Sequence, residues 1–233
     1  MKKIVYLCVI LIDRAFREEI IGNYTESTMA IALKKTRSYT PESGQLKGKS
    51  KFWGFPDMPA NVEFPYKDGD PMCFICQINM EELHAQASDT PDLSLLPRRG
   101  MLYFFAQIDY FLGWSGELEE VIGLWSKDSF RVLYTEDTAE LFTHKTYFED
   151  HSPAAMDAWE MRFESCNDDS DGHKLLGCPF FDEVPSSTSL LQIDEDDDWG
   201  LRFFDSGMIN FIIDSNSLMH RDFSKTELYF HTL

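Results

Sequence analysis

The chain has 233 residues, of which 43% are hydrophobic and 26% are charged, a balance typical of a folded globular protein rather than a disordered one. Its 40 acidic and 21 basic side chains give a net charge of −19, which repels nucleic-acid phosphates and argues against a nucleic-acid partner. The five cysteines are an odd number scattered among apolar residues, which favours reduced thiols and predicts a cytoplasmic location.

The N-terminal segment combines two lysines with a short apolar run. Lys2 and Lys3 precede the apolar residues 4–12, as in a secretory signal, but charged residues follow in place of a small-residue cleavage site. The run is also too short to span a bilayer. Apolar residues recur at helical spacing over 9–20, so we predict an N-terminal helix within residues 1–26 and no membrane partner. A targeting segment is the alternative.

Apolar runs farther along the chain predict a sequence of strands. They lie at 28–33, 73–79, 130–135, 141–148, 190–194 and 227–232, and the alternation of Trp159, Met161 and Phe163 predicts one more. Residues 34–50 are polar and contain proline and glycine, which indicates a loop. Short helices are expected from Asn79 to Gln86 and from Ser217 to about Phe223. These elements predict a β-rich α+β fold.

Three sequence blocks occur twice in the same order. KFWGFP at 51–56 and KLLGCP at 174–179 share the pattern KxxGxP, and each precedes an apolar strand ending in Gln-Ile and then Asn or Asp. Gly100 and Gly200 each precede two aromatic residues at the third and fourth places after the glycine. We therefore predict two degenerate copies of one β unit, at approximately 28–150 and 151–233, packed about a pseudo-twofold axis with a groove between them.

Several of these motifs resemble those of the YwqG-like family of bacterial proteins. The resemblance rests on KxxGxP, on LLQID at 190–194, on DSGMINFII at 205–213 and on RDFSK at 221–225, and it extends from about Ser27 to the C-terminus. It implies an internally duplicated α+β architecture in a cytoplasmic bacterial protein. The family has no established activity and supplies no catalytic residues. We accordingly predict an N-terminal helix over 1–26 and a single YwqG-like domain over 27–233.

Several motifs resemble parts of metal-binding sites, but none supplies a full set of ligands. NDDSDG at 167–172 resembles the start of a calcium loop, but Cys178 occupies the position where a glutamate should close the shell. The acidic run Asp194–Asp198 could attract a divalent ion, yet alternate acids in a strand point to opposite faces. Cys73 and Cys76 form a CxxC inside a predicted strand, which favours core packing. We expect no metal and no cofactor.

Candidate binding residues lie at matching places in the two predicted copies. Two glutamines end matching apolar strands, each followed two places on by Asn or Asp, where these side chains could line the groove; the alternative for the glutamines is a structural hydrogen bond to a neighbouring turn. The two lysines that begin KxxGxP could flank the groove or be exposed without a role. The Asp-Ser-Gly turn at 205–207 could face the same groove, or its side chains could simply cap a turn. The candidate ligand-binding residues are Gln77, Asn79, Gln192, Asp194, Asp205, Asn210, Lys51 and Lys174. The catalytic residues stay unknown.

The absence of familiar catalytic motifs, together with the charge, favours a binding protein over an enzyme. We predict a non-enzymatic acidic module of inhibitor or immunity type that engages a basic protein, because opposite charges speed encounter. The alternative is an enzyme or small-ligand-binding protein that uses the predicted groove. The sequence sets neither the substrate nor the oligomeric state.

Overall fold

The fold is built on one large antiparallel sheet. The structure, a computed structural model, describes residues 29–108, 122–185, 187–204 and 206–232. Within these ranges, eleven strands follow one another in the order β8-β15-β14-β13-β12-β1-β11-β2-β6-β7-β9. Their bounds are β1 Met29–Tyr39, β2 Lys51–Phe52, β6 Cys73–Asn79, β7 Met101–Ala106, β8 Gly123–Leu124, β9 Phe130–Thr135, β11 Ala158–Asn167, β12 Lys174–Leu175, β13 Thr188–Asp194, β14 Gly207–Ile213 and β15 Glu227–Thr232.

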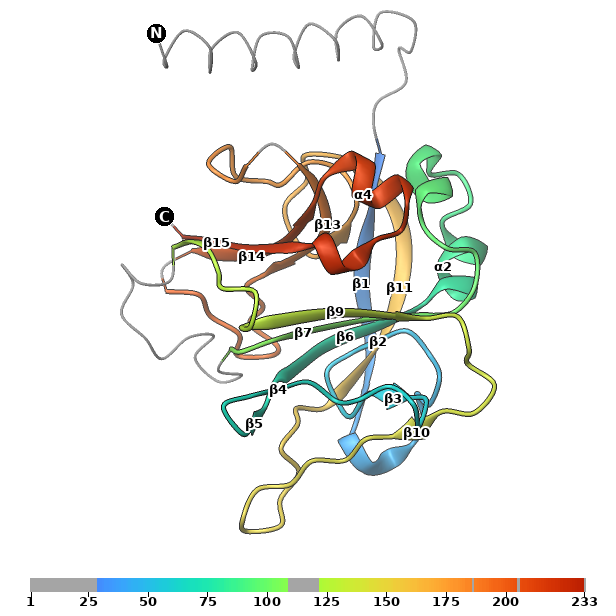
Figure 1. Cartoon of the computed structure of the whole chain (residues 1–233), viewed down its shortest axis with the longest axis vertical. Helices are drawn as coiled ribbons and strands as arrows, with labels where there is room; N and C mark the ends of the chain where they lie inside the picture. Colours follow the sequence, from blue (N-terminus) through green and yellow to red (C-terminus); the bar gives the residue numbers. More distant parts are fainter. Residues whose placement is uncertain (1–28, 109–121, 186, 205, 233) are drawn as a thin grey trace, which may run out of the picture.

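The two longest strands, β1 and β11, form the middle of the sheet and pair along almost their whole length. Alternate residues of each strand point to the same face. Ile31 and Leu33 of β1, with Met161 and Phe163 of β11, belong to the main hydrophobic core. In Figure 1 these two strands run vertically, whereas β7, β9, β14 and β15 run roughly across the view.

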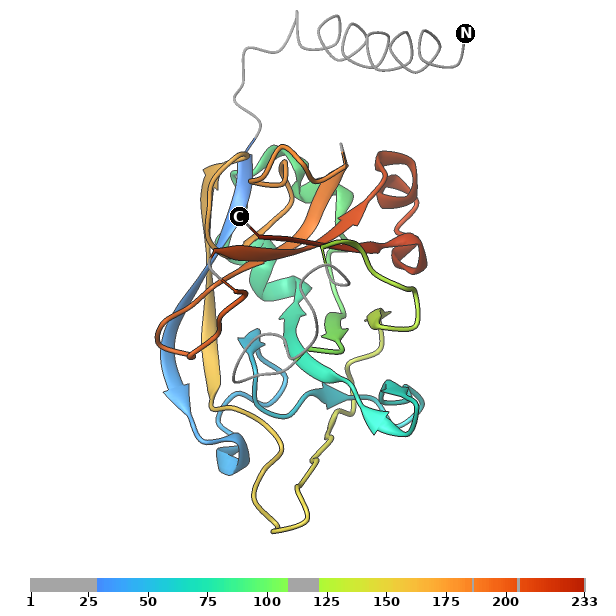
Figure 2. The same cartoon turned by 90° about the vertical axis from the view of Figure 1, so that its left-hand side faces the viewer.

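The sheet curls until its two halves face each other. The ring of Phe211 in β14 lies 5.2 Å from that of Phe104 in β7 and 6.0 Å from that of Phe130 in β9, measured between centroids. Figures 1 and 2 show the curl from two directions. The main core is therefore enclosed between two parts of one sheet.

Strands β6 and β13 each contain a register shift. In β6 the shift falls between Phe74 and Cys76, and in β13 it falls between Ser189 and Leu191. A bulge lets two consecutive residues face the same side of a sheet. Two apolar residues in succession therefore enter the core, and the glutamine that follows them points to the outer face.

Helical segments are short and begin at side-chain caps. Helix α2 (Met80–Gln86) begins at Asn79, whose side chain accepts hydrogen bonds from the backbone of Glu81 and Glu82. Helix α4 (Ser215–Met219) begins after Asp214, which accepts from the backbone of Ser217. Three 3₁₀ segments, η1 (Pro41–Ser43), η2 (Pro91–Leu95) and η3 (Phe223–Lys225), lie in connections.

A second, smaller core covers the outer face of β6 and β7. Phe74, Tyr103 and Phe105 pack there against Met58 and Met72. The covering segments contain two small two-stranded sheets, β3 (Asp57–Met58) with β10 (Phe142–Thr143), and β4 (Tyr66–Lys67) with β5 (Asp70–Pro71). Figure 1 shows both at the lower end of the molecule.

The predicted fold class was wrong. The structure is dominated by strands, its described part contains only the short α-helices α2 and α4, and one continuous sheet replaces two β units packed about a pseudo-twofold axis. The reason is the pairing of β1 with β11, which joins all the strands into one ladder of hydrogen bonds. KxxGxP instead forms a similar turn at two places, in which Trp53 and Leu176 each adopt positive φ. The predicted N-terminal helix lies outside the described residues.

Most of the predicted strands are present, although β7 was not predicted. The strands predicted at 73–79, 130–135 and 227–232 match β6, β9 and β15, and the helix predicted from Asn79 to Gln86 is confirmed. Three predictions were wrong. The helix expected from Ser217 to about Phe223 is α4, which runs from Ser215 to Met219 and ends before the separate segment η3. The expected loop at 34–50 begins late, because pairing with β11 extends β1 to Tyr39, and the strand expected at 141–148 reduces to two residues.

Candidate functional site

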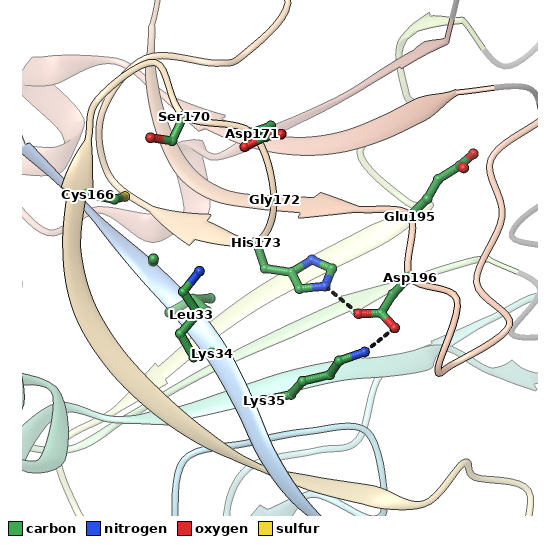
Figure 3. Close-up of a pocket in the computed structure, with 11 residues that line it drawn as sticks. Leu33, Lys34, Lys35, Cys166, Ser170, Asp171, Gly172, His173, Glu195 and Asp196 are labelled. Carbon is green, nitrogen blue, oxygen red and sulfur yellow. Dashed lines mark hydrogen bonds and ion pairs between the residues drawn. The ribbon is translucent and has the colours of Figure 1, made fainter.

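A polar cleft opens where β1 separates from the segment that follows β11. It has a volume of about 500 Å³ and lies between β1, the loop at 170–173 and the turn at 195–196 (Figure 3). This volume falls in the range of small-molecule sites, roughly 300–1,000 Å³. Its chemically functional lining side chains are Lys34, Lys35, Cys166, Ser170, Asp171 and Glu195, with His173 and Asp196 at one end.

A chain of polar contacts joins three elements beside the cleft. His173, which immediately precedes β12, accepts a hydrogen bond at Nδ1 from the backbone N–H of Asp194, at 3.1 Å. Its Nε2 lies 3.3 Å from Oδ2 of Asp196. Lys35 of β1 donates to the other oxygen of Asp196 and also lies 2.8 Å from Asp198. Because Nδ1 is an acceptor, the imidazole carries its proton on Nε2 and donates it to Asp196.

Aromatic rings enclose this chain of contacts. Trp199 stacks on His173 with ring centroids 4.7 Å apart and an interplanar angle of 16°, and Phe52 lies 4.8 Å from Trp199. The ammonium of Lys35 lies 5.1 Å from the ring centroid of Trp199 and 5.4 Å from that of Trp159. Such cation–π contacts are favourable, particularly where water is partly excluded. The rings therefore hold the cation in place.

The electrostatics keep Asp196 ionised. Burial by itself would raise the pKa of this carboxyl, but hydrogen bonds from His173 and Lys35 outweigh that effect and lower the pKa to about 2. Asp194 shows the opposite behaviour: burial raises its pKa, and the nearby Asp171 adds to the rise. The two carboxylates therefore differ in role, one forming an ion pair and the other bound by backbone N–H groups.

The acidic run Asp194–Asp198 is a tightly bonded turn. Asp194 accepts from the backbone of Gly172, and Glu195 accepts from the backbone of Phe203 and Gly207. Asp196 accepts from the backbone of its own turn as well as from the side chains described above. Asp197 pairs with Arg202, and Asp198 pairs with Lys35. The carboxylates of this run are thus engaged by groups of the protein itself.

The NDDSDG loop at 167–172 is held from below by a buried lysine. Lys174 is fully buried and donates hydrogen bonds from Nζ to the carbonyl oxygens of Asp168, at 2.8 Å, and of Ser170, at 2.6 Å. Burial lowers the pKa of Lys174. The carbonyl at the seventh place of a calcium loop, that of His173, accepts a hydrogen bond from the backbone N–H of Leu33 at 2.8 Å, and Asp169 and Asp171 are exposed.

The remaining residues predicted in the second half of the chain lie beside this loop or under it. Gln192 is buried, accepts from the backbone of Phe180 and donates to the carbonyls of Ser170 and Gly172. Asn210 is buried opposite Gln192 and accepts from Ser189. Neither side chain lines the cleft of Figure 3. Asp205 lies outside the described residues.

The predicted residues in the first half gather around a buried aspartate instead. Gln77 accepts from the backbone of Asp57 and donates to Oδ2 of Asp57 and to the carbonyl of Lys49. Lys51 forms an ion pair with Asp57 at 2.7 Å, and burial lowers the pKa of Lys51 despite the opposing effect of that carboxylate. Asn79 caps α2 and donates to the carbonyl of Gly48. The structure thus separates the seven described candidates into two internal networks rather than one groove.

Sequence reasoning missed the side chains that shape the cleft. Lys35 was assigned to a loop, and no motif identified His173 as a site residue. Continuing the alternation of Ile31 and Leu33 would have placed Lys35 on the core face of β1, where a charge needs a partner. No comparable signal identified Asp196 as that partner, because the contact spans 161 positions.

The chemistry of the cleft favours binding over proton transfer. Both ring nitrogens of His173 are engaged, so this imidazole is not free to act as a general base. Burial raises the pKa of the half-buried Cys166 thiol, which disfavours the nucleophilic thiolate. Among the described side chains, no group of three or more His, Cys, Asp or Glu could hold a metal ion.

Comparisons with known proteins add a family but no activity. In the described part of the chain, no helix is both long enough and apolar enough to cross a bilayer. A comparison with curated proteins gives no match. A family model matches residues 50–231, most of the chain. The chain therefore belongs to the family described as domain of unknown function DUF1963.

Proposed function

We propose that this protein binds a small polar molecule carrying a positively charged amine in the cleft between β1 and the loop at 170–173. The observation that carries this proposal is a cleft of about 500 Å³ whose walls are already fixed by internal bonds. Lys174 holds the loop, and the contacts among Lys35, His173 and Asp196 hold the facing turn. A site fixed in advance loses less conformational entropy on binding.

The charges around the cleft support a cationic ligand. Lys35 is neutralised by Asp196 and Asp198, whereas the carboxylate of Asp171 is exposed at the edge of the cleft. The net charge of −19 adds a long-range attraction for cations. Lys34 is exposed on β1, so an amine would bind toward the Asp171 side, away from that lysine.

The test uses a single variant with a matched control in the same loop. Small amines, a guanidino compound and matched carboxylates are titrated against the full chain by calorimetry and thermal shift. We expect an amine to raise the melting temperature of the natural protein and of Asp169→Asn, because Asp169 does not line the cleft. Asp171→Asn should weaken that binding by roughly tenfold, the value of one charge-assisted hydrogen bond. Preference for carboxylates, or equal binding by both variants, would overturn the proposal.

A second role follows from the charge alone: a non-enzymatic acidic module, of inhibitor or immunity type, that binds a basic protein. It is supported by the 40 acidic against 21 basic side chains, since opposite charges accelerate and orient association. We extend this proposal to a cytoplasmic bacterial protein of the YwqG-like type, with a domain over 27–233 preceded by an N-terminal segment. Affinity capture at low and high salt, followed by titration of the purified partner, tests it. An affinity for the partner that does not change with ionic strength would contradict this role.

A further inference from the structure

The lower end of the molecule exposes a group of aromatic side chains on two separate segments. We call residues 63–70 and 140–150 together the aromatic–acidic face. Four large aromatic side chains on it are exposed: Tyr66 by 51%, Phe142 by 49%, Tyr147 by 45% and Phe148 by 51%. Exposed apolar side chains that gather in one area mark interaction surfaces more often than isolated ones do.

A stacked pair of rings joins the two segments. Phe64 stacks on His144 with centroids 4.3 Å apart and an interplanar angle of 13°, and it also contacts Tyr66 at 5.6 Å. Tyr147 lies 5.8 Å from Phe55, just before β3. Figures 1 and 2 both place β4, β5 and the segment after β10 at the same end of the molecule.

The exposed rings are held in position by hydrogen bonds. Thr143 donates to Oδ1 of the buried Asp57, at 2.7 Å, and the backbone N–H of His144 donates to the carbonyl of Pro56. The hydroxyl of Tyr147 donates to Glu42 in η1, at 2.7 Å. The rings next to these anchors are therefore presented to solvent by a fixed backbone.

Carboxylates surround the rings. The aromatic–acidic face contains six carboxylates, Glu63, Asp68, Asp70, Glu140, Glu149 and Asp150, but two lysines. One of these, Lys67, is already engaged by Ser129 at 3.0 Å and by Asp128 at 3.7 Å. Aromatic rings and carboxylates together suit arginine and lysine, whose stems and cationic groups lie over rings while the charge pairs with an acid.

We propose that the aromatic–acidic face is the docking surface for an arginine- or lysine-rich segment of a basic partner protein. This inference rests on the second proposed role, binding a basic protein, and specifies where on the molecule that partner binds. The surface is separate from the cleft of Figure 3, with which it shares no lining residue.

The test compares two double variants that each remove two exposed apolar side chains. Phe142→Ser/Phe148→Ser alters the face, whereas Phe180→Ser/Met219→Ser removes side chains exposed by 43% and 61% elsewhere. The probe is a short fluorescein-labelled peptide of alternating arginine and serine, titrated by anisotropy at low and high salt. We expect the face variant to bind roughly tenfold more weakly than the natural chain, and the control variant to bind like the natural chain.

The outcomes distinguish the proposed docking surface from the proposed role of binding a basic protein. If the natural chain binds the peptide and both variants bind it equally well, the basic-partner role survives and the face is refuted. If the natural chain does not bind the peptide at either salt concentration, both are refuted. If neutral phospholipid vesicles bind the natural chain but not the face variant, the face binds a membrane surface and the proposal of a protein partner is refuted. If the face variant does not fold, hydrogen exchange of the natural chain is measured with and without the peptide. The proposal requires that the peptide slow exchange in residues 63–70 and 140–150, and unchanged exchange there would refute it.

Discussion

Removing the carboxylate of Asp57 should destabilise the protein more than most single substitutions. Asp57 and Lys51 form an ion pair at 2.7 Å with side-chain exposures of 1% and 5%. The same carboxylate accepts from the backbone of Gly48 at 3.0 Å, from Gln77 at 3.1 Å and from Thr143 at 2.7 Å. It therefore connects the loop at 44–50, β6 and β10.

The loss of stability expected for Asp57→Asn follows from the groups that lose their partner. The amide cannot accept all four hydrogen bonds, and it leaves the Lys51 ammonium buried without a negative partner. Breaking a buried pair from one side costs about 3–5 kcal/mol, a large part of a total stability of roughly 5–15 kcal/mol. For a domain of this size, that loss lowers the melting temperature by roughly 10 °C.

A double-mutant cycle separates the ion pair from its surroundings. Lys51→Met should cost less than Asp57→Asn, about 1–3 kcal/mol, because the carboxylate keeps its other donors. The double variant should be more stable than the sum of the single effects predicts, by about 1–3 kcal/mol. Urea denaturation followed by tryptophan fluorescence gives all the free energies, provided that the dependence on urea is equal among the variants. Exact additivity, or a loss below about 1 kcal/mol for Asp57→Asn, would refute this description of the pair.

Three further substitutions test other parts of the structure. Asp196→Asn should cost about 2 kcal/mol at neutral pH; because its folded-state pKa of about 2 lies below the ordinary value of 3.8, this contribution is present above pH 3.8 and is lost as pH falls through 2. Urea denaturation across that range checks it, and a difference that persists undiminished at the lowest pH would contradict the assignment. Gly54→Ala should cost more than Gly44→Ala: both glycines have positive φ, but a Cβ at Gly54 would lie 2.6 Å from the Cβ of Ala158, and one at Gly44 meets nothing within 4 Å. We expect about 1 kcal/mol for Gly44→Ala and a further 1–3 kcal/mol, about the cost of overpacking, for Gly54→Ala; equal melting temperatures would argue against this packing. Lys174→Met should accelerate hydrogen exchange at 167–172, measured by mass spectrometry, and unchanged exchange there would show that the lysine does not hold the loop.

Local patterns in the sequence determined where most elements lie. Strands such as Cys73–Asn79 and Phe130–Thr135 consist of apolar runs with clear ends, and Asn79 supplies a helix cap that depends only on the next few residues. These signals involve neighbours in the chain, so a single sequence contains them. The register shifts were not visible, because a bulge is defined by the partner strand.

KxxGxP forms a similar turn at both of its positions, but its recurrence does not indicate two packed copies of one β unit. Trp53 and Gly54 in one occurrence, and Leu176 and Gly177 in the other, all adopt positive φ, so the motif specifies a similar turn twice. It does not specify what the flanking strands pair with. That choice depends on the contact of β1 with β11, whose paired residues lie more than a hundred positions apart in the chain.

The charge of the molecule, the ends of several strands and the cap of α2 could all be predicted from the sequence, because they depend on composition or on neighbouring residues. Which polar residues come into contact depends on the folded structure. Lys35 contacts Asp196 and Lys51 contacts Asp57 because strands and turns bring them together. Gln77 and Gln192 form hydrogen bonds with the backbone of neighbouring turns. A buried charge or amide must be satisfied, but one sequence does not say by which partner, since the partner is fixed by strand pairing and loop geometry rather than by local preference.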